Sequence, residues 1–295
     1  MTKYGTIFSY WSKDWDTDYM QVLRNAAKSD INCIEFHTNR TMDWSQNKID
    51  DFVALAKDLD IEILMNGGVE HEEITYSDDP AVRHLGINKI TSYLTQASRL
   101  GAKFFDGGYA EGWPSAPKVP LTAELKQVYT ERVIGSIGEM VKVADSLGIT
   151  MSMEIVNRFE AFLVNTAKEA RYIAERVDHP NFKVTMDTYH MNIEEDSIEE
   201  AIQTLGKKYL GHVHLGESNR KLPGQGSQVD WDKVFNGLKS VGYSERLLLE
   251  PFTKAFGTIG NSVFLWRDLS NNAGEEQLIK EMKESVAFVK TKYEK

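Results

Sequence analysis

Four residues with metal-binding side chains stand at or near the ends of four successive apolar segments in the second half of the chain. They are Glu154, Asp187, His214 and Glu250. Three carboxylates and one imidazole suit a hard-to-borderline divalent ion such as Mn²⁺, Co²⁺ or Mg²⁺, and they would leave coordination positions open for substrate oxygens. Each acid taken alone could be salt-bridged or solvated. Together they would concentrate negative charge in one place, at a cost that a divalent cation removes, so the sequence predicts one metal site.

These residues belong to a regular alternation of strand-like and helix-like segments. The expected strands cover residues 6–10, 31–37, 61–67, 102–108, 149–156, 182–187, 210–216 and 246–252. Eight strands are what a closed (β/α)₈ barrel requires, and such a barrel carries its active site at the carboxyl ends of its strands. A doubly wound sheet alternates in the same way, so the barrel is favoured by the strand count and by the polar strand ends. We expect a (β/α)₈ TIM barrel that occupies residues 1–295 as a single domain.

Residues that accept left-handed backbone stand directly before several expected strands and indicate helix ends. They are Asp30, Asp60, Gly101, Gly148 and Gly242. Helix starts are marked by Asp79 before Pro80, and by Asp230 or Asp232 before an apolar helical segment. These signals place helices between the expected strands, as the barrel requires.

Alternation within the later strands indicates which side chains face the barrel interior. Thr150, Ser152 and Glu154 share one face of their strand, and apolar residues occupy the other. If the apolar face packs on the helices, the polar face points inward. His212 has the same parity as His214. Because one histidine suffices as a ligand, we expect His212 in the core or behind the ligands.

The composition excludes several classes of function. The chain has 295 residues, of which 41% are hydrophobic and 26% are charged, as in an ordinary soluble globular protein. A net charge of -10 without a basic stripe argues against a nucleic-acid partner. No segment reads as a signal peptide or a membrane span, so we expect a cytoplasmic protein without membrane contact. The single cysteine, Cys33, lies in an apolar run and is expected to be buried.

Longer motifs around the predicted ligands resemble the ketose 3-epimerases, the family of D-tagatose 3-epimerase and D-allulose (D-psicose) 3-epimerase. The motifs are MEIVNRFE, MDTYHMNIEED, GHVHLGESNR and LEPF, followed by GTIG and WRDLS. The likeness runs nearly from end to end, beginning with GTIFSYW. It implies a xylose isomerase-like barrel that epimerises free ketoses at C3 with one divalent metal ion, usually Mn²⁺ or Co²⁺, and that forms a homodimer or homotetramer.

Carried over by position, the resemblance also implies roles for individual residues. The quartet Glu154, Asp187, His214 and Glu250 would bind the metal, Glu160, His190 and Arg220 would hold the O1 to O3 end of the sugar, and Trp113 would form an aromatic wall. Family members often carry an aromatic residue where this chain has Ile7. The preferred ketose therefore does not carry over.

Epimerisation at C3 needs a base on one face of the sugar and an acid on the other. We expect Glu154 and Glu250 to form this pair, with a cis-enediolate between the two proton transfers. An aldose–ketose isomerase on the same barrel is an alternative, although such enzymes commonly use two metals and no second complete ligand set is visible. A non-catalytic sugar-binding barrel is another. A zinc phosphodiesterase that acts on damaged DNA needs more histidines at its site, whereas this chain has 7 in all and a net charge of -10.

Overall fold

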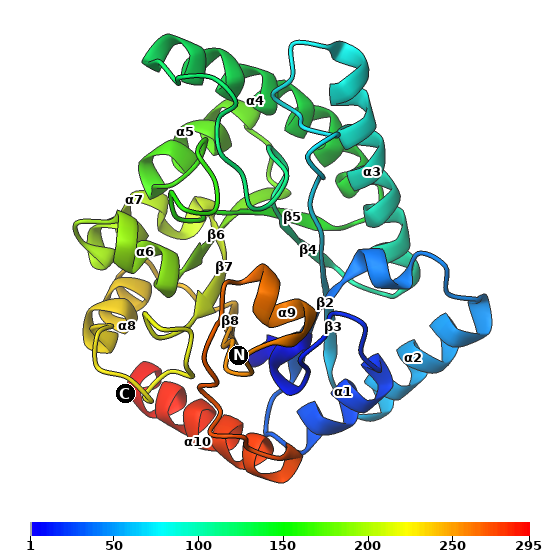
Figure 1. The fold of residues 1–295 in the computed structure, drawn as a ribbon, viewed down its shortest axis with the longest axis vertical. Coiled ribbons are helices and arrows are strands. Elements are labelled where there is room, and N and C mark those ends of the chain that lie inside the picture. The colour runs from blue at the N-terminus through cyan, green and yellow to red at the C-terminus, as the bar shows by residue number, and fades with distance from the viewer. Residues whose placement is uncertain (1) are drawn as a thin grey trace.

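The computed structural model describes residues 2–295, which form eight parallel strands closed into a barrel (Figure 1). The strands are β1 (Lys3–Ile7), β2 (Cys33–His37), β3 (Glu62–Asn66), β4 (Phe104–Gly107), β5 (Thr150–Glu154), β6 (Phe182–Asp187), β7 (Leu210–Leu215) and β8 (Arg246–Leu249). Each strand pairs with the next along the chain, and β8 pairs with β1. The expected (β/α)₈ barrel is confirmed.

Helices surround the barrel (Figure 1). They are α1 (Tyr19–Ala27), α2 (Gln46–Asp58), α3 (Pro80–Arg99), α4 (Ala123–Ser146), α5 (Ala167–Val177), α6 (Thr188–Glu194), α7 (Ile198–Tyr209), α8 (Trp231–Ser240), α9 (Gly257–Ser262) and α10 (Glu275–Tyr293), with the 3₁₀ turns η1 (Phe8–Trp11) and η2 (Thr38–Thr41). The short α9 packs through Ile259 against Ile7 at the end of β1 and against Phe252, which follows β8. Over residues 2–295, no helix has both the length and the apolar character needed to cross a membrane.

The local signals in the sequence set the helix boundaries. The Asp79 carboxylate accepts a hydrogen bond from Ala81 N at 2.8 Å, with Pro80 in the first turn, and Asp230 accepts one from Lys233 N at 3.2 Å. Left-handed backbone, with φ between 54° and 76°, occurs at Asp30, Asp60, Gly101, Gly148 and Gly242. Each of these predicted caps and helix ends is confirmed.

The first strand is displaced from the expected range of 6–10. β1 ends at Ile7, and the next residues form η1. Gly5 lies in the middle of β1 and pairs with Cys33 so closely that a Cβ at Gly5 would lie 2.3 Å from Cys33 O. Because glycine has a low strand propensity, a prediction from propensity alone begins this strand after Gly5 and so places it too late in the chain.

The barrel interior changes from apolar to polar toward the carboxyl ends of the strands. A buried apolar cluster contains Cys33, Leu64, Phe104 and Leu248. Two residues further along β2 and β4 come Glu35 and Asp106, each 1% exposed. Side chains two apart share a face of a strand, so a polar layer lies directly above the apolar one. The predicted burial of Cys33 is confirmed.

An ion pair at the amino end of the barrel joins strands that are not neighbours. Glu62 on β3 accepts a hydrogen bond from Arg246 Nε at 3.0 Å and lies 2.9 Å from Lys3 Nζ. Burial alone would raise the pKa of Glu62, but the hydrogen bonds and positive charges of Arg246 and Lys3 outweigh it, so the pKa lies below its ordinary value of 4.5. The ionised carboxylate therefore stabilises the fold.

We expect Glu62→Gln to lower the free energy of unfolding at pH 7 by about 1–3 kcal/mol, because the amide loses charge-assisted hydrogen bonds. Since the folded pKa of Glu62 is depressed, the difference from the wild type should be complete above pH 4.5 and should shrink as the pH falls through the folded value. Urea unfolding across this pH range measures the difference in free energy of unfolding, with the exposed Glu284→Gln as the control. A difference that does not change with pH would contradict the assignment of a depressed pKa to Glu62.

Candidate functional site

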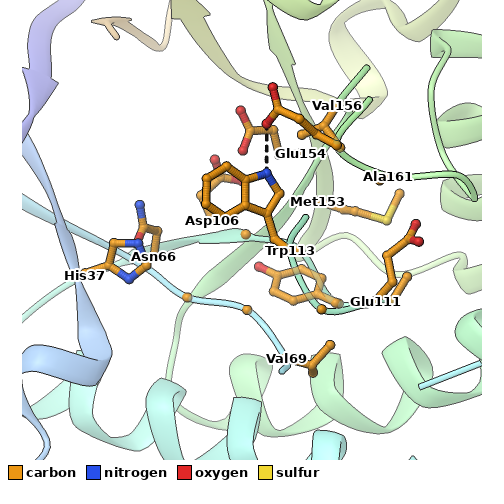
Figure 2. A pocket seen from close by; sticks show the side chains of 18 of the residues that line it. His37, Asn66, Val69, Asp106, Glu111, Trp113, Met153, Glu154, Val156 and Ala161 are labelled. Atoms are coloured by element: carbon orange, nitrogen blue, oxygen red, sulfur yellow. Dashed lines mark hydrogen bonds between the residues drawn. The ribbon is translucent and has the colours of Figure 1, made fainter. Parts of the chain in front are cut away.

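A pocket of about 320 Å³ opens at the carboxyl end of the barrel (Figure 2). Six of the eight residues predicted for the site line it, namely Trp113, Glu154, Glu160, His190, Arg220 and Glu250. The other two, Asp187 and His214, are 0% and 1% exposed and lie against Glu154 and Glu250. The fold therefore brings all eight predicted residues into one region.

The register of the barrel places the four predicted metal ligands side by side. β5 ends at Glu154, and β6 ends at Asp187, which pairs with His214 on β7. Glu250 directly follows β8, and its N–H donates to Leu215 O at 2.9 Å. One ligand atom from each of the four lies within 4.8 Å of the others. A single ion can be reached by all four side chains.

The His214 ring presents one nitrogen to the carboxylates. Its Nδ1 lies 3.1 Å from Glu154 Oε1 and 3.4 Å from Glu250 Oε2. Its Nε2 faces the barrel interior, 3.5 Å from Glu35 Oε2. Nδ1 is therefore the atom that can join the three acids around an ion.

The charges of this quartet favour a cation at its centre. Burial raises the pKa of both Glu154 and Asp187 above their ordinary values. Burial alone would lower the pKa of His214, but Glu250 and the other surrounding carboxylates raise it well above its ordinary value. The surrounding carboxylates thus favour positive charge at this position. The donor set and this demand for positive charge both fit a divalent metal.

Arg220 is the second positive charge at the site. Its Nη1 donates to Asp187 Oδ2 at 2.6 Å and to Glu250 Oε2 at 3.0 Å, and its Nη2 lies 3.1 Å from His190 Nε2. The guanidinium stacks 3.8 Å from the centre of the Tyr189 ring. Arg220 is thereby fixed between the ligands and the pocket residue His190.

The remaining predicted pocket residues form a second hydrogen-bonded group. The Glu160 carboxylate accepts from Trp113 Nε1 at 2.8 Å, the dashed line in Figure 2, and from Asn157 Nδ2 at 3.1 Å. The backbone N–H of Asn157 donates to His190 Nδ1 at 3.1 Å. Burial, followed by the charge of Arg220, lowers the pKa of His190 to about 3, so this imidazole is neutral. Asn157, which joins Glu160 to His190, was not predicted, although it stands inside the MEIVNRFE motif.

A buried polar group beneath the quartet was also not predicted from the sequence. Glu35, Asp106, His212 and His214 each place one ligand atom within 4.8 Å of the others. The signal was available, because Glu35 and Asp106 are single acids inside apolar strands. A second group of ligand-type residues therefore exists, and the expectation that there is none was wrong. The second group is not independent of the quartet, because both contain His214. His212 is 0% exposed and lies behind the ligands, as expected.

The far wall of the pocket comes from the first half of the barrel. His37 and Asn66, at the ends of β2 and β3, line this side and lie close together in Figure 2. Ile7 lies outside this wall, buried in a cluster with Phe252 and Ile259. Phe252 lines the pocket, as do Trp15 and Val263, which pack against the same cluster, so Ile7 contacts the pocket only through neighbouring side chains.

Comparison with known proteins agrees with this fold. Residues 23–290 match the family of xylose isomerase-like TIM barrels. The chain is 35% identical to D-psicose 3-epimerase of Ruminiclostridium cellulolyticum, over 97% of this chain and 96% of that protein. It is 32% identical to D-psicose 3-epimerase of Agrobacterium fabrum, over 97% of each.

A solved structure of D-psicose 3-epimerase in the presence of D-fructose superposes with a TM-score of 0.93 at 32% identity, over 99% of both chains. A second, D-psicose 3-epimerase with D-tagatose from Clostridium cellulolyticum, gives 0.93 at 34% identity, again over 99% of both chains. The chain therefore belongs to the ketose 3-epimerase family, within the xylose isomerase-like TIM barrels, and is an epimerase of the isomerase class.

Proposed function

We propose that this protein interconverts free ketoses that differ in configuration at C3, such as D-fructose and D-allulose, or D-tagatose and D-sorbose. The proposal depends on the quartet of Glu154, Asp187, His214 and Glu250, which converges within 4.8 Å at the wall of the pocket. Relatives named D-psicose 3-epimerase and L-ribulose 3-epimerase support C3 as the reacting carbon. Because the relatives differ in the ketose they are named for, the substrate preference of this chain is for experiment to decide.

One divalent ion would be held by the quartet, with Mn²⁺ or Co²⁺ preferred and Mg²⁺ as a further option. The support is chemical: three carboxylates and His214 Nδ1 converge, and their charges favour a cation between them. When bound, such an ion would polarise the C2 carbonyl and stabilise the negative charge that develops on O2.

Glu154 and Glu250 would carry out the proton transfers. They approach His214 Nδ1 from β5 and from the end of β8, and both line the pocket. One glutamate removes the C3 proton, the electron pair of the broken C–H bond forms the C2=C3 bond, and the π pair of the C2 carbonyl moves onto O2 to give a cis-enediolate. The other glutamate returns a proton to the opposite face of C3, which inverts that centre with no net change in protons or electrons. The two roles exchange when the reaction runs in reverse.

The other pocket residues would hold the sugar. Glu160 and the neutral His190 would form hydrogen bonds to the O1 to O3 end, and Arg220 would add donors from a fixed guanidinium. The Trp113 ring, 40% exposed at the pocket, would cover one side of the ketose. We further propose that residues 1–295 act as one cytoplasmic domain in a homodimer or homotetramer, without a nucleic-acid or membrane partner.

We expect Glu154→Gln and Glu250→Gln each to reduce kcat by at least about 10³-fold, because each removes one of the two proton-transfer groups. In D₂O, wild-type protein loaded with Mn²⁺ should place deuterium at C3 of the product ketose, read by NMR. Glu284→Gln, an exposed change on α10, is the matched control and should leave turnover unchanged. Substantial activity in either site variant, or a product formed at full rate without deuterium at C3, would refute the two-glutamate mechanism.

The same sugar analysis separates the alternatives. An aldose–ketose isomerase, which the shared second group beneath the quartet would favour, forms an aldose. A non-catalytic sugar-binding barrel forms no product and incorporates no deuterium into the ketose.

Metal binding should stabilise the folded protein, since an ion that binds only the folded state at 100 times its Kd adds about 2.7 kcal/mol. We expect Mn²⁺ or Co²⁺ to raise Tm after dialysis against a chelator, and we expect His214→Ala to abolish this rise. Differential scanning fluorimetry provides the measurement, with the exposed His84→Ala as the matched control. An unchanged metal response in His214→Ala would exclude the quartet as the metal site.

A further inference from the structure

Glu35 connects two parts of the site that come from opposite halves of the barrel. It lies on β2, one layer below the predicted ligands, and is 1% exposed. Its Oε1 accepts a hydrogen bond from Asn66 Nδ2 at 2.6 Å. Its Oε2 lies 3.3 Å from His212 Nε2 and 3.5 Å from His214 Nε2. One carboxylate thus contacts a pocket residue on β3 and two histidines on β7.

The atoms on this side of Glu35 complement one another. Within residues 2–295, Glu35 Oε2, His212 Nε2 and His214 Nε2 are buried and have no partner that satisfies strict hydrogen-bond geometry. Buried polar atoms in native proteins are nearly always paired. An ionised carboxylate oxygen is an acceptor for a ring N–H, and small side-chain shifts at 3.3–3.5 Å suffice to form such bonds. Glu35 Oε2 is therefore the natural acceptor for the inner face of both rings.

This contact determines which nitrogen of His214 can face a metal. A histidine ligand commonly donates its other ring N–H to a carboxylate, which fixes the tautomer and the ring orientation. With Nε2–H directed at Glu35, the lone pair of Nδ1 faces Glu154 and Glu250. Without the carboxylate, the ring could adopt the other tautomer and lose its ligand atom.

The second oxygen of Glu35 orients Asn66 at the pocket. Because the amide nitrogen of Asn66 is engaged by Glu35, its Oδ1 remains as an acceptor, and no partner satisfies it in the described part of the chain. Asn66 lines the pocket beside His37 (Figure 2). An acceptor there would meet a sugar hydroxyl beyond C3, away from the O1 to O3 end.

A second metal ion in this layer is the competing interpretation. Glu35, Asp106, His212 and His214 have the ligand types for one. However, Asp106 already accepts from Thr185 Oγ1 at 2.7 Å, and Glu35 accepts from Asn66. An ion on His214 Nε2 would also require that ring to bridge two metals. The contacts favour a network of hydrogen bonds over a second ion.

We propose that Glu35 is a positioning residue that orients the metal ligand His214 through one carboxylate oxygen and the substrate-binding residue Asn66 through the other. The effect on turnover rests on the proposed function. The effects on metal binding and on sugar binding do not require turnover and can be measured separately.

The test compares three variants by calorimetric titration with Co²⁺ and by the visible absorption of bound Co²⁺. Glu35→Gln should weaken Co²⁺ binding by about 10-fold or more and change the Co²⁺ spectrum, since outer-shell partners of ligating histidines have effects of this size. Asn66→Ala should keep the wild-type Co²⁺ affinity and raise the Kd and KM for D-fructose or D-allulose by about 10-fold, the effect of one lost hydrogen bond. Glu62→Gln is the matched control, because it neutralises a barrel-strand carboxylate remote from the site and should leave Co²⁺ binding unchanged.

Several results would overturn the proposal. Wild-type Co²⁺ affinity and spectrum in Glu35→Gln, with only a stability loss like that of Glu62→Gln, would make Glu35 merely structural. Binding of two Co²⁺ ions by the wild type and one by Glu35→Gln would establish a second metal site instead. If Glu35→Gln does not fold, Glu35→Asp, which retains the charge but withdraws the carboxylate, should show the same loss of Co²⁺ affinity. If the wild type shows no turnover but Glu35→Gln still weakens Co²⁺ binding and changes the Co²⁺ spectrum, the proposed function is refuted and this inference is not.

Discussion

The crowding of three carboxylates at the buried base of the pocket is the constraint on which the rest of the site depends. Glu154, Asp187 and Glu250 converge in a region where burial raises the pKa of the first two and so disfavours their charged forms. Positive charge must balance them. Arg220 supplies part of it through hydrogen bonds to Asp187 and Glu250, and the carboxylates raise the pKa of His214 well above its ordinary value. A divalent ion held by the quartet would supply further positive charge and the Lewis acid that C3 chemistry needs.

The closed barrel is what makes such a concentration of charge possible. Consecutive parallel strands deliver one polar side chain each to the same end, and the covalent frame holds them there in spite of their repulsion. The apolar layer of Cys33, Leu64, Phe104 and Leu248 supports this polar layer from below. The ion pair of Glu62 with Arg246 lies at the opposite end and contributes stability rather than chemistry. Stability and function are thus divided along the barrel axis.

Much of this arrangement could be predicted from the sequence. Period-two alternation and helix-ending residues located seven strands closely, and the strand-end residues Glu154, Asp187, His214 and Glu250 identified the quartet. The first strand was misplaced, because Gly5 is required by close packing on Cys33, a tertiary contact that local propensity does not report. Glu35 and Asp106 were overlooked, because each is a lone acid in an apolar run. Their contacts with His214 form only when the closed barrel brings β2 and β4 close to β7. The hydrogen-bond role of Asn157 likewise depends on a loop conformation.

The central claim is that one ion occupies the quartet and balances its charge. A crystal structure of the protein with bound Mn²⁺, with the ion located by anomalous scattering, tests it most directly. We predict a single anomalous peak within coordination distance of Glu154, Asp187, Glu250 and Nδ1 of His214, with Nε2 of His214 hydrogen-bonded to Glu35. The absence of a peak between these four residues, or a peak in the layer of Glu35, Asp106 and His212 instead, would contradict it.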